Sequence, residues 1–231
     1  MKKIILCADT LDDEIVSSLA GYADRVAVMP RWDKIPCGIG YHPDMLGFAD
    51  GDRLWLNEEY YRANAAFFDG LGADVCPCSE GYGKYPCDVL FNAFAIGEVL
   101  IGREDSLAFS LKEHFASVCD VRQGYAKCSS AVFGSNVITA DGGIASAARA
   151  LGACVLQIEP GSVALEGYDY GFIGGALVEV SGDTLMAFGN IHAHVQGDDI
   201  VAFAAGKGYR VISFDHLPLT DHGGILSLYI R

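Results

Sequence analysis

Residues 45–57 read MLGFADGDRLWLN, and this stretch decides the fold. An apolar run is followed by a tight turn centred on Gly51 and by a second apolar run, which is the pattern of a β-hairpin. Residues 58–70 follow with apolar side chains at helical spacing, acidic residues at the start and a glycine at the end, and this pattern predicts a helix. Residues 74–77 then predict a short strand. The predicted unit is therefore hairpin, helix and strand.

The same unit recurs three more times along the chain. In every repeat two hairpin strands come first, followed by a helix and a last strand. The predicted ranges, in that order, are 88–92, 98–102, 106–115 and 118–121; then 130–133, 136–139, 143–151 and 154–158; then 171–180, 184–188, 198–207 and 209–213.

The two ends of the chain complete a fifth unit. Residues 3–7, 12–21 and 25–29 predict strand, helix and strand but lack a first hairpin strand, and residues 224–230 form a lone terminal strand. Pairing of 224–230 with 3–7 supplies the missing strand and closes a ring, which removes exposed sheet edges. We therefore predict a single α/β domain over residues 1–231, a five-bladed propeller of ββαβ units with pseudo-fivefold symmetry. The alternative is an open α+β sheet with hairpins.

Composition and charge exclude several classes of function. The chain has 16 Lys and Arg against 30 Asp and Glu, a net charge of −14, so its surface repels a phosphate backbone and nucleic acid is not an expected partner. No uninterrupted apolar run is long enough for a transmembrane span, so no membrane partner is expected. The N-terminal residues predict a strand and not a signal peptide. Eight cysteines without an export signal favour reduced thiols and a cytoplasmic location.

Five such units in 231 residues resemble the pentein, or α/β-propeller, superfamily. That superfamily contains guanidino-modifying enzymes (deiminases, dimethylarginine dimethylaminohydrolase and amidinotransferases) and also ribosome anti-association factors, which bind without catalysis. The stretch Leu165-Glu166-Gly167-Tyr168-Asp169 resembles the Glu-Gly-Gly-Asp stretch of arginine deiminases, with Tyr168 in place of the second glycine. Residues 123–129 and 167–175 resemble an uncharacterised bacterial branch of the superfamily.

The sequence departs from the active members of that superfamily at the nucleophile. The resemblance implies a cysteine in the last unit, in a Gly-Gly-Ile-x-Cys pattern, but residues 223–227 read Gly-Gly-Ile-Leu-Ser, which puts Ser227 at that place. A serine without an adjacent base is a much weaker nucleophile than a thiolate. Two hypotheses follow. One is a guanidino-modifying enzyme of the amidinohydrolase or amidinotransferase type, and the other is a non-catalytic ligand-binding or interaction protein on the same fold.

The residues just before the first hairpin strand of each unit are expected to converge on the axis of such a ring. Carboxylates gathered there suit a guanidinium or amine ligand, because planar N–H donors pair with them bidentately. For any single aspartate the alternative is that it caps a strand end and accepts from turn amides. The predicted ligand is therefore a small cationic guanidino or amine compound, and its predicted binding residues are Asp44, Asp88, Asn92, Lys127, Glu166, Tyr168, Asp169 and Asp221.

Cys128 is the predicted nucleophile. Lys127 beside it is expected to lower the pKa of its thiol, and the glycine and tyrosine shortly before it predict an exposed loop. The alternative is inert packing, because free cysteines are among the most buried residue types. In the enzyme hypothesis Cys128 attacks the guanidinium carbon, and His42 or His222 acts as the acid or base.

Other patterns are weaker. Cys76-Pro77-Cys78, with Cys37 and Cys87, suggests a metal-binding or redox role. The spacing of these cysteines does not match a zinc knuckle, and we expect no metal. Residues 171–175 lack the strand-to-helix context of a dinucleotide site, so no cofactor is expected. Cys7, Cys119 and Cys154 lie in apolar runs and are expected in the core. The substrate and a homodimeric state are left open.

Overall fold

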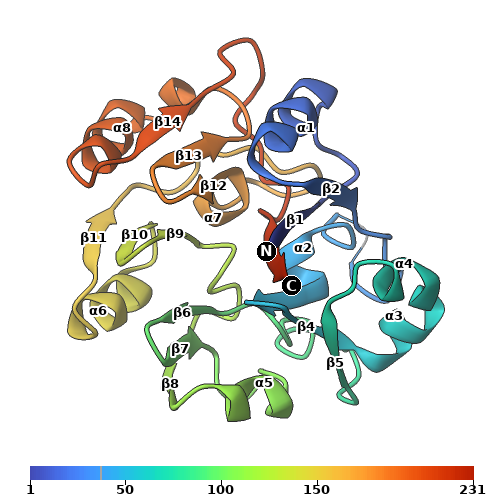
Figure 1. Ribbon diagram of the computed structural model, residues 1–231. Coiled ribbons are helices and arrows are strands. Elements are labelled where there is room, and N and C mark those ends of the chain that lie inside the picture. The colour runs from blue at the N-terminus through green and yellow to red at the C-terminus, as the bar shows by residue number, and fades with distance from the viewer. Residues whose placement is uncertain (37) are drawn as a thin grey trace.

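The computed structural model describes residues 1–36 and 38–231. In this part of the chain, five three-stranded sheets stand around a central axis like the blades of a wheel (Figure 1). Within each sheet the middle strand pairs antiparallel with the inner strand and parallel with the outer strand. This is the five-bladed α/β-propeller that the repeats predict.

The closing blade contains both ends of the chain. Its elements are β15 (Leu226–Ile230), β1 (Lys2–Cys7), α1 (Asp13–Leu19), η1 (Ala20–Tyr22) and β2 (Arg25–Val28). The next blade has α2 (Pro43–Leu46), β3 (Gly47–Asp50), β4 (Arg53–Asn57), α3 (Glu58–Ala63), α4 (Ala65–Asp69) and β5 (Asp74–Cys78).

The other three blades follow in chain order. The first has β6 (Phe94–Ile96), β7 (Val99–Gly102), α5 (Phe109–His114) and β8 (Ser117–Asp120). The second has β9 (Ser130–Phe133), β10 (Asn136–Thr139), α6 (Gly142–Ala150) and β11 (Cys154–Gln157). The last has α7 (Ile173–Ala176), β12 (Leu177–Ser181), β13 (Thr184–Ala187), η2 (Ile191–Ala193), α8 (Gly197–Ala205) and β14 (Arg210–Ile212).

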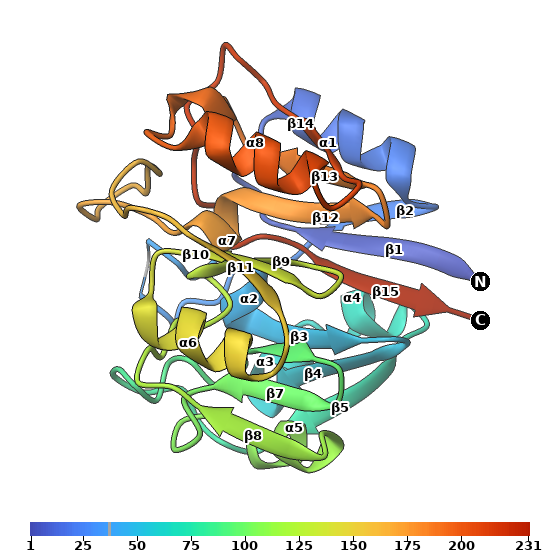
Figure 2. The same cartoon turned by 90° about the vertical axis from the view of Figure 1, so that its left-hand side faces the viewer.

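The ring closes through the two ends of the chain. β15 pairs antiparallel with β1, from Lys2 opposite Ile230 to Leu6 opposite Leu226, which is the pairing expected between residues 224–230 and 3–7. The N- and C-termini lie next to each other at one face of the wheel, as Figures 1 and 2 show. This pairing completes the fifth three-stranded sheet, so each of the five sheets has an inner strand of its own at the axis.

Short polar side chains begin several of the outer helices. Asp12, Asn57 and Asp141 each accept hydrogen bonds from backbone N–H groups in the first turn of α1, α3 and α6. Such N-caps satisfy donors that the helix itself leaves unpaired.

Three predicted elements are wrong in detail. The first is the hairpin strand predicted over 171–180, because Ile173–Ala176 form the helix α7 and the strand β12 begins only at Leu177. The pattern of residues 88–92 predicts an inner strand, but these residues form turns, and the strand is β6, a few residues later. Asn92 instead turns its side chain to the axis, where Oδ1 accepts from the backbone N–H groups of Lys127 and Cys128. The helix predicted over 58–70 is divided at Asn64 into α3 and α4, and the Asn64 side chain donates to the Tyr60 carbonyl.

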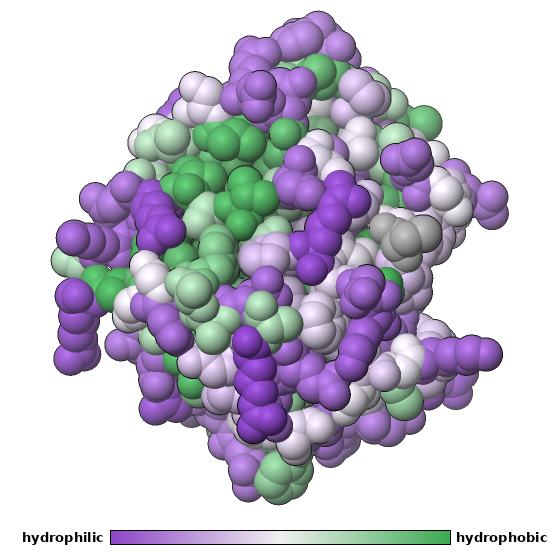
Figure 3. Space-filling model, turned by 90° about the vertical axis from the view of Figure 1, so that its right-hand side faces the viewer, coloured by the Kyte–Doolittle hydropathy of each residue, from purple (hydrophilic) through white to green (hydrophobic). Residues whose placement is uncertain are grey.

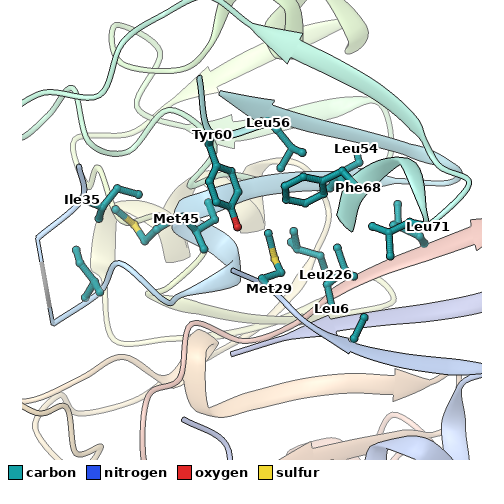
Figure 4. Close-up of a cluster of buried hydrophobic side chains, with 14 of the residues drawn as sticks. Leu6, Met29, Ile35, Met45, Leu54, Leu56, Tyr60, Phe68, Leu71 and Leu226 are labelled. Carbon is teal, nitrogen blue, oxygen red and sulfur yellow. The ribbon is translucent and has the colours of Figure 1, made fainter. Parts of the chain in front are cut away.

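Hydrophobic side chains fill the spaces between neighbouring blades. The cluster in Figure 4 joins the closing blade to its neighbour and includes Leu6, Met45, Leu54, Tyr60 and Leu226, all buried. Full burial of one such side chain contributes roughly 1.5–3 kcal/mol. This packing fixes each blade against the next and so holds the axial segments in place.

The outer strands of the blades are only partly covered. Cys154 on β11 is exposed and Cys119 on β8 is half-buried, so the expectation that both lie in the core is wrong. An outer strand lies at the edge of its sheet, where an apolar run need not be buried. Seen from the side in Figure 3, the surface is largely hydrophilic with one apolar area. Among the described residues, no helix is long and apolar enough to cross a membrane.

Candidate active site

The segments that precede the inner strands meet on the axis in a buried polar group. We call this group the hub cluster. Its members are 3% exposed or less and come from four different blades: His42, Asp44, Asn92, Cys128 and Asp221. All five are among the site residues that the sequence predicts, so the structure brings this part of the prediction together.

Cys128 is held by two side chains of the hub cluster. Its Sγ lies 3.0 Å from Asp44 Oδ2, to which the thiol donates, and Asn92 Nδ2 donates to the same sulfur at 2.9 Å. Asn92 Oδ1 also accepts from the backbone N–H of Cys128 at 3.1 Å. The amide of Asn92 therefore fixes both the backbone and the sulfur of Cys128.

His42 and Asp221 form the other half of the hub cluster. His42 Nδ1 lies 3.7 Å from Asp221 Oδ1. The carboxylate of Asp221 accepts from the backbone N–H groups of Phe172 at 2.8 Å and Gly223 at 2.9 Å. Within the described residues, three atoms of the hub cluster have no hydrogen-bond partner: Nδ1 and Nε2 of His42 and Oδ1 of Asp44. Buried polar atoms without partners are rare in folded proteins and need an explanation.

Two glycines allow the blades to come this close. A Cβ atom on Gly175 would collide with the Asp221 carboxylate, and one on Gly223 would collide with His42. Gly223 also has a φ of 72°, which disfavours other residues. The glycines of these segments therefore serve close packing at the axis.

Burial and like charges determine the protonation of the hub cluster. Burial, followed by the charges of Asp44 and Asp221, raises the pKa of the Cys128 thiol well above its usual value. Burial, with Asp221 adding to it, raises the pKa of Asp44 to about 7, and burial raises the pKa of Asp221 to about 6. Burial lowers the pKa of His42 to about 3. At neutral pH the thiol is protonated and the imidazole is neutral.

The expected environment of Cys128 is therefore wrong in two respects. The thiol is 3% exposed and does not lie in an exposed loop. Its pKa is raised and not lowered, because burial and the charges of Asp44 and Asp221 outweigh the hydrogen bond that Asn92 donates to the sulfur. The side chain of Lys127 is half-buried, and its Nζ donates to the Gly174 carbonyl at 3.4 Å.

A cavity of about 240 Å³ opens above His42 and Asp221. Tyr168 and Asp169, from the stretch that resembles arginine deiminases, line it. Its remaining walls are largely apolar and aromatic: Ile39, Met45, Tyr125, Leu165, Tyr170 and Phe172. This cavity joins a buried carboxylate to the loop face of the wheel.

A second cavity, of about 260 Å³, lies among the inner strands β3, β6, β9, β12 and β15. Asp44 and Lys127 line it, and so does Ser227 on β15. Figure 2 shows the loop before α7 and the two termini at opposite faces of the wheel. The hub cluster therefore has His42 and Asp221 at one cavity and Asp44 at the other.

Besides Lys127, Tyr168 and Asp169, three more predicted site residues lie outside the hub cluster. His222 Nδ1 is 2.8 Å from Thr10 Oγ1, and burial lowers the pKa of this histidine to about 4. Asp88 accepts from the Tyr125 hydroxyl at 2.9 Å and so supports a wall of the first cavity. Glu166 is exposed and is not among the residues that line this cavity.

Sequence reasoning missed the backbone donors of the site. The N–H of Phe172 holds Asp221, and no residue pattern predicts which amide will do so. Cys76 and Cys78 lie on β5. In the described part of the chain, the one group of three residues that could hold a metal ion is in the hub cluster, and it does not include these two cysteines. Cys37 lies outside the described residues.

The ring of five blades around a buried polar axis defines an α/β-propeller of the pentein type. The chain belongs to a family of unknown function, DUF6873, whose model matches residues 6–226. No curated protein matches the sequence significantly.

Solved structures of dimethylarginine dimethylaminohydrolase share this fold. An adduct of a histidine-to-glycine variant with S-methyl-L-thiocitrulline has a TM-score of 0.56 and 14% identity over 99% of each chain. An adduct with 4-chloro-2-hydroxymethylpyridine has a TM-score of 0.58 and 12% identity over 93% of each chain. A cysteine-to-serine mutant from Pseudomonas aeruginosa, in complex with citrulline, has a TM-score of 0.56 and 12% identity over 99% of each chain. At these identities the likeness establishes the fold alone.

Proposed function

We propose that this protein binds a small guanidino or amine compound in the cavity above His42 and Asp221 and, where the compound carries a guanidino group, modifies that group through Cys128. The observation that carries the proposal is the pair of buried carboxylates, Asp44 and Asp221, both fully inside the wheel and both next to a cavity. The positive charge of Lys127 lowers the pKa of both carboxyl groups, but one ammonium group cannot balance the charge of two carboxylates. A cationic ligand would supply the missing charge, and guanidinium N–H groups pair well with carboxylates.

The walls of the cavity also suit a cation. Tyr125 stacks on Phe172 with 6.2 Å between ring centroids, and Tyr170 meets Phe172 edge to face at 6.2 Å. Aromatic faces attract cations, and Asp169 adds a carboxylate among the lining residues. The fold shared with dimethylarginine dimethylaminohydrolase supports the same ligand class by analogy only.

The proposed reaction uses the contact between Cys128 and Asp44. The positive charge of a bound guanidinium lowers the pKa of the thiol, whose proton passes to Asp44 Oδ2, the atom that already accepts its hydrogen bond. An S–C bond forms at the guanidinium carbon, a C–N bond breaks, and the proton leaves with the departing amine. One water then hydrolyses the S-linked intermediate: its oxygen bonds to the carbon as the C–S bond breaks, one of its protons returns to the sulfur and the other passes through Asp44 to solvent, leaving a urea-type product. Asp44 replaces His42 and His222 as the proposed base.

A non-catalytic binding protein is the second candidate. Cys128 is not among the residues that line either axial cavity, and Ser227 stands where the resemblance implies a cysteine. These two observations favour ligand binding without covalent chemistry.

Thermal denaturation with a panel of guanidines, amines and neutral ureas tests ligand binding, because a ligand stabilises the state that it binds. Guanidines or amines should raise the melting temperature of the wild type, and Asp221→Asn should remove this shift.

Labelling by 2-chloroacetamidine, mapped by mass spectrometry in a Cys154→Ser background, tests the chemistry. If Cys128 is labelled faster in folded than in denatured protein, the result supports the enzyme hypothesis. If a ligand raises the melting temperature but Cys128 is not labelled faster, the result supports the binding-protein hypothesis. No shift with any cation would overturn both.

A further inference from the structure

We propose that His42, Asp44 and Cys128 together bind a divalent transition-metal ion, with Zn²⁺ as the best fit. One ring nitrogen, one carboxylate oxygen and the thiol sulfur lie within 4.8 Å of one another, and all three residues are buried. Nitrogen, sulfur and carboxylate oxygen are the donors that zinc uses in proteins. In the part of the chain that is described, no second group of three such residues occurs.

The unpartnered atoms of the hub cluster point to a missing ligand. Both nitrogens of His42 and Oδ1 of Asp44 lack hydrogen-bond partners among the described residues, and both side chains are 1% exposed. Leaving a buried polar group unpaired costs about 1–3 kcal/mol. An ion held by these three residues would occupy one ring nitrogen and a carboxylate oxygen at once.

The surroundings are those of metal-bound side chains. Asn92 Nδ2 donates to the Cys128 sulfur at 2.9 Å, a contact that favours a thiolate. Asp221 Oδ1 lies 3.7 Å from His42 Nδ1, and a carboxylate beside an imidazole commonly orients a ligating histidine. When an ion displaces the thiol proton, the thiolate together with Asp44 and Asp221 gives the cluster a negative charge, which a dication balances.

Zinc binding requires the three ligand atoms, which now lie within 4.8 Å of one another, to take up tetrahedral spacing. Zinc bond lengths place tetrahedral ligand atoms about 3.3–3.8 Å apart, and Cys128 Sγ to Asp44 Oδ2 is already 3.0 Å. Three protein ligands leave a fourth position, and His42 borders the first cavity, through which water or a small ligand could reach the ion. An ion bound here would occupy the thiol and carboxylate that the proposed guanidino chemistry uses, so metal binding and that chemistry are alternative states of the site. The metal proposal does not rest on the guanidino chemistry.

Titration of the metal-free full-length protein with Co²⁺ tests the site. We expect a sulfur-to-cobalt charge-transfer absorption that saturates at one equivalent and disappears when Zn²⁺ is added. Cys128→Ser should abolish this absorption, and His42→Gln or Asp44→Asn should weaken Co²⁺ binding by more than about tenfold. Cys154→Ser removes an exposed cysteine on β11 and should leave the absorption unchanged. Absence of the absorption in the wild type, or its persistence in folded Cys128→Ser, would overturn the proposal.

X-ray absorption of the zinc-loaded wild type gives a readout that needs no variant. A zinc shell with one sulfur and otherwise nitrogen or oxygen supports the site. A shell of oxygen alone, or one with two or more sulfurs, would overturn it. Neither measurement uses a guanidino ligand, so failure of the metal site and failure of the proposed function are distinguishable.

Discussion

Single residues of the hub cluster determine how stability depends on pH. Asp44 and Asp221 have pKa values of about 7 and about 6 in the folded protein, against an ordinary value of 3.8 for an aspartate. Carboxylates with raised pKa values bind more protons in the folded state than in the unfolded state. Their contribution to stability is therefore fully present below about pH 4 and is lost as the pH rises through 6 and 7.

We expect Asp221→Asn to flatten this part of the pH profile. An amide does not titrate, so the variant should lose less unfolding free energy than the wild type between pH 4 and pH 7. Urea unfolding at a series of pH values, with a chelator present, measures the difference. Asp169→Asn, at an exposed position, is the control and should follow the wild type. If the unfolding free energy of Asp221→Asn and of the wild type changed equally with pH, the raised pKa of the Asp221 carboxyl group would be contradicted.

A second prediction at the residue scale concerns the close approach of Gly175 to Asp221. Gly175→Ala would put a methyl group into the Asp221 carboxylate and should lower the free energy of unfolding by about 1–3 kcal/mol. Gly182→Ala is the matched control, because nothing lies within 4 Å of its Cβ position. Equal stability of the two variants in urea unfolding would show that the axis is looser than described.

At the scale of elements, the sequence predicts the blades better than the segments between them. Hairpins such as 45–57 are evident because apolar runs flank a glycine turn, and they appear as β3 and β4. The segment 88–92 looks like a strand but forms turns, because Asn92 is used at the axis. Local pattern cannot reveal this, since the partners of Asn92 come from residues 127 and 128. For the same reason the pattern could not decide between an exposed Cys128 and the buried alternative, and the structure shows that this residue is buried.

The start of α3 offers a prediction at this scale. Asn57 accepts from the N–H groups of Glu59 and Tyr60, and its amide donates to the Glu80 carbonyl. Asn57→Ala should cost about 1–2 kcal/mol of unfolding free energy, as expected for a lost N-cap. Asn57→Asp keeps the cap and should recover part of this loss in the same denaturation experiment. An unchanged midpoint for Asn57→Ala would contradict the role of the cap.

At the scale of the whole molecule, closure of the ring brings the site together. Asp221 and Gly223 precede β15, and they reach the axis because β15 pairs with β1. The repeats predict this closure from pattern alone, because the two leftover ends complete one unit. What they do not predict is which side chains become the floor of a cavity, since that depends on packing between four blades.

Two neighbouring residues of β15 test the closure. Leu228 is fully buried opposite Ile4, whereas Tyr229 is 43% exposed. Leu228→Ala should cost about 2–5 kcal/mol of unfolding free energy, and Tyr229→Ala should cost less than about 1 kcal/mol. Chemical denaturation of both variants measures the difference. A similar cost for both would mean that β15 does not seal the ring.

Calorimetric titration of wild type and Asp221→Asn with methylguanidine and methylurea tests the central claim most directly. The two compounds are similar in shape, but only methylguanidine carries a positive charge. The buried carboxylates predict that the wild type binds methylguanidine and not methylurea, and that Asp221→Asn binds neither. Equal binding of both compounds, or unchanged binding of methylguanidine by Asp221→Asn, would contradict a cation site at the axis.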